Sequence, residues 1–315
     1  MKRLPLLLAL LGVGAILLLL AWFDVGAVWD ATRSVGWTGF AVLLGWQAVL
    51  FVVLGTAWCA VMPGTAWPLL IWGRMVRDAA TTCLPFSPVG GYVIGARALT
   101  LHGVSWPVAA AGTVMDVTAE IAAQLLFALF GVAVLVLLRP GSGLVGPIAA
   151  GIVAALALLL LAVWQRRRLG AGLRGLGRRL LGEWFRAQGG LDRLEVALGA
   201  LYAPRRLVVG TLLHLLGWFG TGIGTWLALR LLGLDVDLVH VLALEALLDA
   251  LIAAAFVVPG AAGVQEGGYV VLGAAFGVPP ELALGVSLLR RGKDLVWGIP
   301  ILLMWQMREV RRLAR

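Results

Sequence analysis

Charged residues are scarce in this sequence. Asp, Glu, Lys and Arg make up 13% of its 315 residues, whereas 61% of the residues are hydrophobic, and the mean hydropathy is +0.98. Water-soluble domains of this length do not have such a composition. The composition therefore predicts an integral membrane protein with almost no soluble part.

Residues that bind metals or form disulfides are also rare. The chain has two cysteines and three histidines, and Cys59 and Cys83 stand in apolar sequence without the spacing of metal ligands. This argues against a disulfide framework and a zinc site. The sequence also lacks the His-Glu-x-x-His, Gly-x-Ser-x-Gly and Gly-Lys-Ser/Thr motifs of common enzyme classes. We therefore expect no metal, no cofactor and no enzymatic activity.

Basic residues are concentrated in two places. Ten arginines fall between Arg166 and Arg206, and four more stand near the end of the chain, at Arg308, Arg311, Arg312 and Arg315. Cytoplasmic loops of membrane proteins carry such an excess of Lys and Arg. The net charge of +9 therefore indicates membrane topology rather than nucleic-acid binding. We expect a multi-pass protein of the bacterial plasma (inner) membrane, with the loop 165–206 and both chain ends in the cytoplasm.

Six apolar stretches are long enough to cross a bilayer, which requires about 20 mainly apolar residues per helix. The first follows Lys2 and Arg3 like a signal peptide, but its apolar run is too long and lacks a clear cleavage site, so we expect it to be retained. The predicted crossings are Leu4–Trp22, Trp37–Met62, Trp106–Leu138, Leu144–Trp164, Leu207–Leu232 and Leu282–Trp305.

Two further apolar regions, about Leu69–Leu101 and Val239–Phe276, are interrupted by proline and glycine. Backbone polar groups cannot stay unpaired in hydrocarbon, so irregular segments at membrane depth are buried in protein or line a wet cavity. We interpret each region as a re-entrant hairpin of two half-helices. The residues predicted to form the breaks are Pro85, Gly90, Gly91, Pro259, Gly260, Gly263 and Gly267.

The two broken regions are related by a constant shift of 174 residues, which carries Pro85 onto Pro259 and Gly103 onto Gly277. A weak internal repeat is therefore expected, with repeat one at about 37–138 and repeat two at about 207–305. Because three full crossings separate the hairpins, the repeats are predicted to be inverted, as in many transporters. The predicted fold is a single all-α polytopic membrane domain, 1–315, with six full transmembrane helices and two re-entrant hairpins.

Charged residues within the predicted helices are expected to face the protein interior, because each costs about 2.5 to 3.5 kcal/mol at the centre of a membrane helix. Asp116 and Glu120 lie one turn apart on one helix face, and Arg290 and Asp294 are spaced likewise. We predict a cluster between the repeats with Asp116 and Arg290 as its central pair. Alternatively, these charges pair only to hold the helices in register. Further charges at membrane depth are Glu245, Asp249, Glu266, Arg291 and Lys293.

Arg97 and the histidines are weaker candidates for function. Arg97 follows the first break, where it is suited equally to holding an anionic headgroup at the cytoplasmic face and to anchoring a helix at the interface. His102, His214 and His240 are expected to be hydrogen-bonded structural residues.

The stretch PGAAGVQEGGYVVLGAAFGVPPELALGVSLLRR resembles the Pro-Gly-x-x-Gly-x-x-Glu-Gly signature of the lysylphosphatidylglycerol synthase transmembrane region, a family of flippase-like membrane proteins. The matching positions are Pro259, Gly260, Gly263, Glu266 and Gly267, followed by Arg290. The first half, with SPVGGYVIGARALTLHGV and DVTAE, is similar to the branch associated with hopanoid biosynthesis. The chain departs from the family in having Phe86 and Ser87 after Pro85, where Leu-Pro-Gly-Arg is more usual. No aminoacyl-transferase domain follows Trp305, so lysyl transfer is not expected.

The resemblance implies a transporter that moves a phospholipid or hopanoid between leaflets, with membrane lipids as its partners. Its hairpins would enclose a polar cavity for the headgroup. Two alternatives stay open, a membrane-embedded lipid-modifying enzyme and an accessory scaffold of hopanoid synthesis. The sequence does not predict an oligomeric state. The expected substrate-binding and translocation residues are Asp116, Glu120, Glu266, Arg290, Lys293, Asp294 and Arg97.

Overall fold

The computed structural model describes residues 25–84, 88–138, 190–255 and 263–313, together with residues 143, 146, 150, 151 and 261. Within these ranges the chain forms helices joined by short turns and contains no strand. The all-helical fold class is therefore confirmed for this part of the chain. The predicted crossings Leu4–Trp22 and Leu144–Trp164 and most of the Arg-rich loop lie outside the described residues.

Three of the helices are long and apolar enough to cross a membrane. They lie within α2 (Val25–Val61), α5 (Trp106–Leu138) and α10 (Pro204–Leu231), and they correspond to three of the six predicted crossings. A fourth long helix, α13 (Pro280–Leu313), continues through Pro300 without interruption. Its composition differs from that of the other three because charged residues interrupt its apolar sequence, at Arg290, Arg291, Lys293 and Asp294.

Each broken region forms two short helices. The first gives α3 (Trp67–Cys83) and α4 (Pro88–Thr100), and the second gives α11 (Leu238–Ala254) and α12 (Val264–Ala275). The longest of these have 17 residues, or about 25 Å of helix, which is less than the roughly 30 Å of a hydrocarbon core. Re-entry of each pair into the membrane stays a prediction. Pro85, Pro259 and Gly260 fall outside the described residues.

Glycine is required at two of the predicted breaks, for different reasons. A Cβ on Gly91 in α4 would lie 2.0 Å from Thr81 Oγ1 and 2.9 Å from the Arg77 carbonyl oxygen, so only glycine lets α4 approach α3 this closely. Gly263 precedes α12 with a φ of +77°, a conformation that L side chains rarely adopt. Gly267 has no neighbouring atom within 4 Å of an added Cβ, and Gly90 is a partly buried residue of α4.

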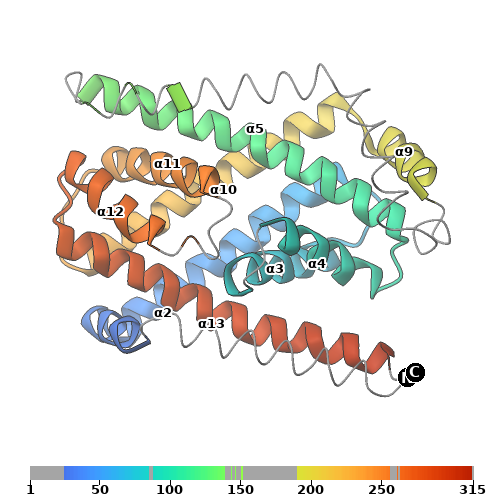
Figure 1. Cartoon of the computed structure of the whole chain (residues 1–315), viewed down its shortest axis with the longest axis horizontal. Helices are drawn as coiled ribbons and strands as arrows, with labels where there is room; N and C mark the ends of the chain where they lie inside the picture. The colour runs from blue at the N-terminus through green and yellow to red at the C-terminus, as the bar shows by residue number, and fades with distance from the viewer. Residues whose placement is uncertain are drawn as a thin grey trace.

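The helices of the two halves have matching contacts. α2 and α10 pack against each other, α5 packs against α10 and α11, and α13 packs in the same way against α2 and α3. Within each half, the two short helices contact each other, and the second of them packs against the long helix that follows. Figure 1 shows α5 and α13 along opposite sides of the bundle, with α3 and α4 towards one end between them and α11 and α12 towards the other. The remaining helix, α9 (Gly190–Leu201), packs against α5.

The first helix bends sharply near its start. Gly36 within α2 has a φ of 71° and a ψ of 161°, which are not helical values. Residues 25–35 therefore form a separate segment that does not continue the axis of residues 37–61, as the dark-blue end of α2 shows (Figure 1). Trp29 and Trp37 meet edge to face across this bend with ring centroids 5.3 Å apart. The Arg33 guanidinium lies 5.0 Å from the Trp29 ring centroid.

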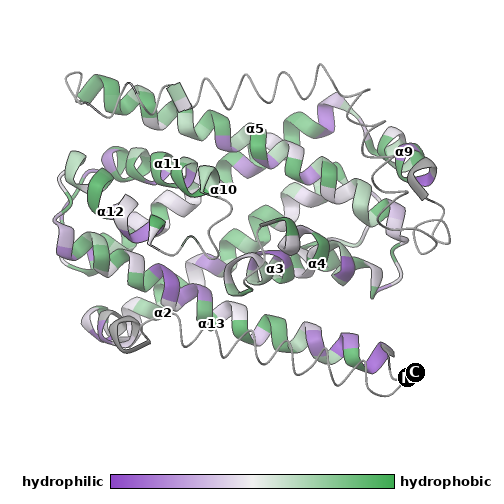
Figure 2. Cartoon of the chain, in the orientation of Figure 1, coloured by the Kyte–Doolittle hydropathy of each residue, from purple (hydrophilic) through white to green (hydrophobic). Residues whose placement is uncertain are grey.

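Hydrophobic residues cover most of the helices, as expected of surfaces that face lipid (Figure 2). Large apolar side chains are exposed on all three candidate spans, for example Val49, Leu126 and Leu212. Hydrophilic residues gather in α3, in the middle of α13 and at its C-terminal end (Figure 2). The first two of these places hold Arg74, Arg77 and Arg290, which are the arginines of the two charged clusters described below.

Candidate functional site

The first group of charges joins α3 to α5. Arg77 of α3 donates to Asp116 Oδ2 at 2.7 Å and to Glu120 Oε1 at 2.7 Å. Arg74, one turn earlier, donates to Glu120 Oε1 at 2.9 Å and to Asp78 Oδ2 at 2.8 Å. We call these five residues, together with His214, the α3–α5 cluster.

The α3–α5 cluster is almost entirely buried. The side chains of Arg77 and Asp116 are 3% and 0% exposed, and the Tyr92 ring covers the Arg77 guanidinium with 4.8 Å between its centroid and the guanidinium carbon. His214 of α10 is fully buried, and its Nε2 lies 2.9 Å from Asp116 Oδ1. The predicted hydrogen bond of His214 is thus formed, and it joins the two halves of the chain.

The second group joins α11 to α13. Arg290 donates to Glu245 and, at 3.1 Å, to Asp249 Oδ1. Two hydroxyl groups complete the surroundings of Glu245, because Tyr269 donates to its Oε2 at 3.0 Å and Thr225 at 2.8 Å. We call these five residues the α11–α13 cluster. Relative to the first cluster the charges are exchanged: here the short helix carries the acids and the long helix carries the base.

The predicted central pair of Asp116 with Arg290 was wrong. Asp116 pairs with Arg77 and His214, and Arg290 pairs with Glu245 and Asp249. The physical reason is the placement of the long helices, because α5 and α13 run along opposite sides of the bundle with the short helices between them (Figure 1). Each charge therefore meets a short helix rather than its counterpart in the other repeat.

Sequence reasoning missed Arg74 and Arg77. They stand in the first broken region, for which we considered only the proline and glycine residues of the break and Arg97. Their spacing of three residues, with Asp78 four residues after Arg74, puts all three on adjacent positions of a helix surface. In an apolar segment that spacing is the signal for a buried ion-pair partner.

Glu266 stabilises the start of its own helix. Its Oε2 accepts the backbone N–H of Gly263 at 2.8 Å, which is half of a capping box. Its Oε1 accepts from Arg291 of α13, and the Ser287 hydroxyl lies 3.4 Å away. Glu266, a predicted translocation residue, therefore links α12 to α13 through Oε1. Its other carboxylate oxygen, Oε2, caps the start of α12.

Lys293, Asp294 and Arg97 bind different parts of the bundle. Lys293 Nζ donates to Gln47 Oε1 of α2 at 2.7 Å and lies 3.8 Å from Asp294 Oδ1. Arg97 of α4 makes a two-pronged pair with Glu309 of α13, with Nη2 2.7 Å from Oε1 and Nε 3.1 Å from Oε2. Arg97 is thus a link between two helices.

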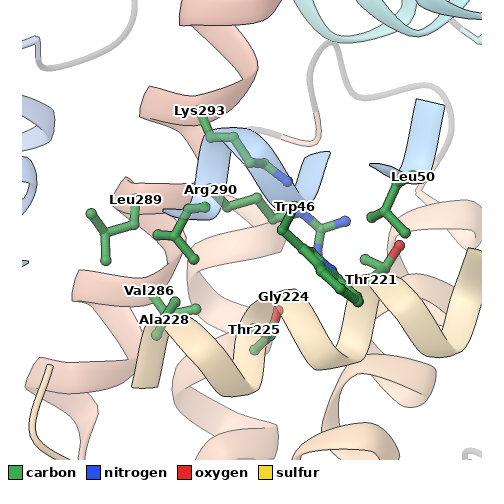
Figure 3. A pocket seen from close by; sticks show the side chains of 11 residues that line it. Trp46, Leu50, Thr221, Gly224, Thr225, Ala228, Val286, Leu289, Arg290 and Lys293 are labelled. Carbon is green, nitrogen blue, oxygen red and sulfur yellow. The ribbon is translucent and has the colours of Figure 1, made fainter. Parts of the chain in front are cut away.

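A pocket opens beside the α11–α13 cluster, between α2, α10 and α13. Arg290 and Lys293 extend from α13 towards the Trp46 indole, with Thr221 and Thr225 of α10 on the other wall (Figure 3). Its free volume is about 30 Å³, the space of roughly one or two water molecules. The side chains of Arg290, Lys293 and Asp294 are 20%, 18% and 28% exposed. Asp116 and Glu120 are not among the residues that line it.

The described residues include no group of three or more His, Cys, Asp and Glu side chains arranged to hold a metal ion. The chemistry that the site offers is therefore that of guanidinium, ammonium and hydroxyl donors beside paired carboxylates. Such a set can bind a polar or ionic headgroup through hydrogen bonds.

Comparison with known families decides where the chain belongs. The family described as "Lysylphosphatidylglycerol synthase TM region" matches residues 7–301. The chain belongs to this family. Membership confirms the resemblance carried by Gly263, Glu266 and Gly267, and it makes the chain a multi-pass membrane protein related to lipids. No curated protein and no solved structure matches the chain, and the hopanoid branch stays a prediction.

Proposed function

We propose that this member of the Lysylphosphatidylglycerol synthase TM family moves a phospholipid or hopanoid-type lipid between the leaflets of a bacterial inner membrane. The headgroup would pass through the pocket between α2, α10 and α13. The observation that carries the proposal is the double role of Arg290, which is the base of a buried ion-pair cluster and also lines a pocket beside Lys293. Charges at membrane depth that reach a cavity are those most often used for transport.

The difference between the two clusters supports this assignment. In the α3–α5 cluster every hydrogen-bonded charge except Asp78 is at most 10% exposed, as expected of ion pairs that hold helices in register. In the α11–α13 cluster, by contrast, Arg290 is 20% exposed and borders the pocket. We therefore assign lipid recognition to the second cluster and helix registration to the first.

The pocket is too small for a headgroup, so transport would require a more open conformation than the one described. Opening requires α13 to separate from α2 and α10, which form the other walls. The matching contacts of the two halves support an inverted repeat, in which one half rocks against the other and exposes the site to each leaflet in turn.

Leaflet exchange in liposomes tests the proposal. Purified protein is reconstituted with a fluorescent phospholipid, and in parallel with a hopanoid-like lipid, and exchange is followed by quenching of the outer leaflet. Lys293→Gln removes a pocket charge while keeping a side chain that can bond Gln47, and we expect exchange to fall by about tenfold or more. Arg230→Gln is the matched control, because Arg230 pairs with Asp235 at an exposed position. Absence of exchange in the wild type would overturn the proposal.

Three further variants locate the site. Arg290→Gln and Glu266→Gln are compared with the wild type for both exchange and thermal stability, and Arg290→Lys keeps the positive charge. Normal exchange in both neutral variants would show that the site lies elsewhere. Lipid extracts from the same liposomes are analysed for new species, since a chemically changed lipid would indicate an enzyme instead.

A further inference from the structure

A second pocket lies at the other end of α13, apart from the proposed transport site. It is lined by Leu101 and His102, which follow α4, and by Arg308, Arg311 and Arg312 near the end of α13. Its free volume is about 310 Å³, at the lower limit of ordinary ligand pockets. Three arginines and no acidic residue line it, so the pocket attracts anions.

The arginines are held in place but keep donors for a ligand. Arg308 donates to His102 Nε2 at 2.8 Å and stacks on Trp72, with 5.0 Å between its guanidinium carbon and the ring centroid. Arg312 donates to the Thr100 carbonyl at 2.9 Å. A guanidinium has five N–H donors, and each of these two uses one nitrogen on the protein. Arg311 forms no ion pair or hydrogen bond with the part of the chain that the structure describes.

The neighbouring polar groups do not neutralise the pocket. Glu309 is not one of the lining residues and forms the two-pronged pair with Arg97. His102 Nε2 accepts from Arg308, so its Nδ1 carries the proton and donates to the Ala98 carbonyl at 2.9 Å. The charge of the three arginines is therefore uncompensated within the lining.

The length of α13 places this pocket at the membrane surface. Its 34 residues extend about 51 Å, which exceeds the roughly 30 Å of a hydrocarbon core. Arg290 and Arg311 are separated by about 32 Å along the helix. If Arg290 lies at mid-depth, where about 15 Å of hydrocarbon remain to be crossed, the end of α13 therefore lies outside the hydrocarbon core, on the side of the lipid headgroups.

We propose that Arg308, Arg311 and Arg312 form a binding site for a phosphate group, presented by an anionic phospholipid headgroup or by free phosphate, and that His102 positions Arg308 within it. Guanidinium groups bind phosphate oxygens in pairs of hydrogen bonds, and three converging arginines supply more donors than one phosphate needs. The site does not depend on the proposed transport activity, since it lies in a different pocket.

The test measures ligand binding by the full-length protein in detergent. Phosphatidylglycerol, phosphatidylcholine and inorganic phosphate are titrated separately, with native mass spectrometry counting bound lipid and thermal shift reporting phosphate. We expect Arg311→Gln to weaken binding about tenfold and Arg311→Lys to weaken it only a few-fold. Arg205→Gln, which removes an exposed arginine at the start of α10, should leave binding unchanged. Arg311 is exposed, so its substitution should not affect folding.

The three probes separate the sources of the phosphate. Retention of phosphatidylglycerol with the expected dependence on Arg311, and no effect of inorganic phosphate, supports a lipid headgroup as the ligand. A response to inorganic phosphate with the same dependence supports a free anion. If no probe binds, or if Arg205→Gln weakens binding as much as Arg311→Gln, the proposal is overturned.

Discussion

Trp46 donates its indole N–H to the carbonyl oxygen of Gly220, the residue 174 positions later in the chain, at 2.7 Å. The shift of 174 residues that relates Pro85 to Pro259 therefore also relates these two bonded residues. Residues that correspond in two halves lie together only near an axis that exchanges the halves. We infer that the contact of α2 with α10 is the centre about which any rocking of the bundle takes place.

The hydrogen bond of Trp46 should contribute measurably to stability. Trp46→Phe keeps an aromatic ring but removes the donor, and a typical net contribution of such a bond is about 1 kcal/mol. We expect the free energy of unfolding, followed by circular dichroism in detergent, to fall by about that amount or somewhat more. Trp37→Phe is the control, because Trp37 is 63% exposed. An equal effect of the two substitutions would contradict the prediction.

Arg77 should be essential for folding. Its loss leaves Asp116 and Glu120 buried without their main partner, and breaking a buried pair in this way typically costs about 3 to 5 kcal/mol. We expect Arg77→Gln to express poorly or to melt at a much lower temperature. The double variant Arg77→Gln with Glu120→Gln should recover part of the loss. If Arg77→Gln is as stable as the wild type, the cluster does not hold α3 to α5.

Close packing of α13 on α3 can be tested at Gly298. A Cβ at this position would lie 2.4 Å from Cys83 Sγ, so we expect Gly298→Ala to destabilise the protein by about 1 to 3 kcal/mol. Adding Cys83→Ala removes the clashing sulfur and should restore much of the stability, which a double-mutant cycle measures. Gly267→Ala is the control, since nothing lies within 4 Å of its added Cβ. A destabilisation that Cys83→Ala does not relieve would contradict the expected packing.

Movement of α13 relative to α10 should be required for lipid exchange. A Cβ on Gly285 of α13 would lie 3.3 Å from Leu232 Cδ1 at the end of α10, so the two positions are in contact, and a disulfide can be introduced across this contact with Gly285→Cys and Leu232→Cys. In a background with Cys59→Ser and Cys83→Ala, oxidation should stop exchange and reduction should restore it. Each single cysteine serves as a control. Undiminished exchange by the oxidised protein would exclude opening along this side.

The orientation in the membrane can be tested at the end of the chain. The positive-inside pattern predicts that Arg311, Arg312 and Arg315 lie in the cytoplasm. A reporter protein fused after Arg315 should therefore be inaccessible to protease in intact spheroplasts and accessible after lysis. Digestion in intact spheroplasts would show that the topology is inverted. The phosphate pocket would then lie at the other leaflet.

The long helices were predictable because a single physical quantity, the thickness of the hydrocarbon core, sets the length of apolar sequence that they need. A continuous apolar run must match the thickness of the hydrocarbon core, and the predicted crossing Trp106–Leu138 has the same bounds as α5. The breaks were predictable for a related reason, since Gly91 and Gly263 stand where a close approach or a positive φ excludes other residues. The lengths of the long helices depend on local sequence alone, whereas the requirement at Gly91 comes from the packing of α4 on α3.

The pairing of the charges was not predictable in this way. Spacing of four residues places Asp116 and Glu120 on one helix face, but it does not say which neighbouring helix that face meets. That depends on the rotation and packing of whole helices, which brought Arg77 rather than Arg290 to Asp116. The pocket beside Arg290 has the same origin, because it is formed by three helices that are distant in the chain.

The bend at Gly36 has a consequence for how the protein sits in a membrane. Trp29 and Trp37 are exposed on both sides of it, and indole rings prefer the level of the lipid headgroups. We expect residues 25–35 to lie flat on the bilayer surface while residues 37–61 descend from it. The bend at Gly36 would then fix how deeply α2 enters the bilayer. A thinner bilayer should therefore tilt residues 37–61 without moving the end of this segment that lies at the bend.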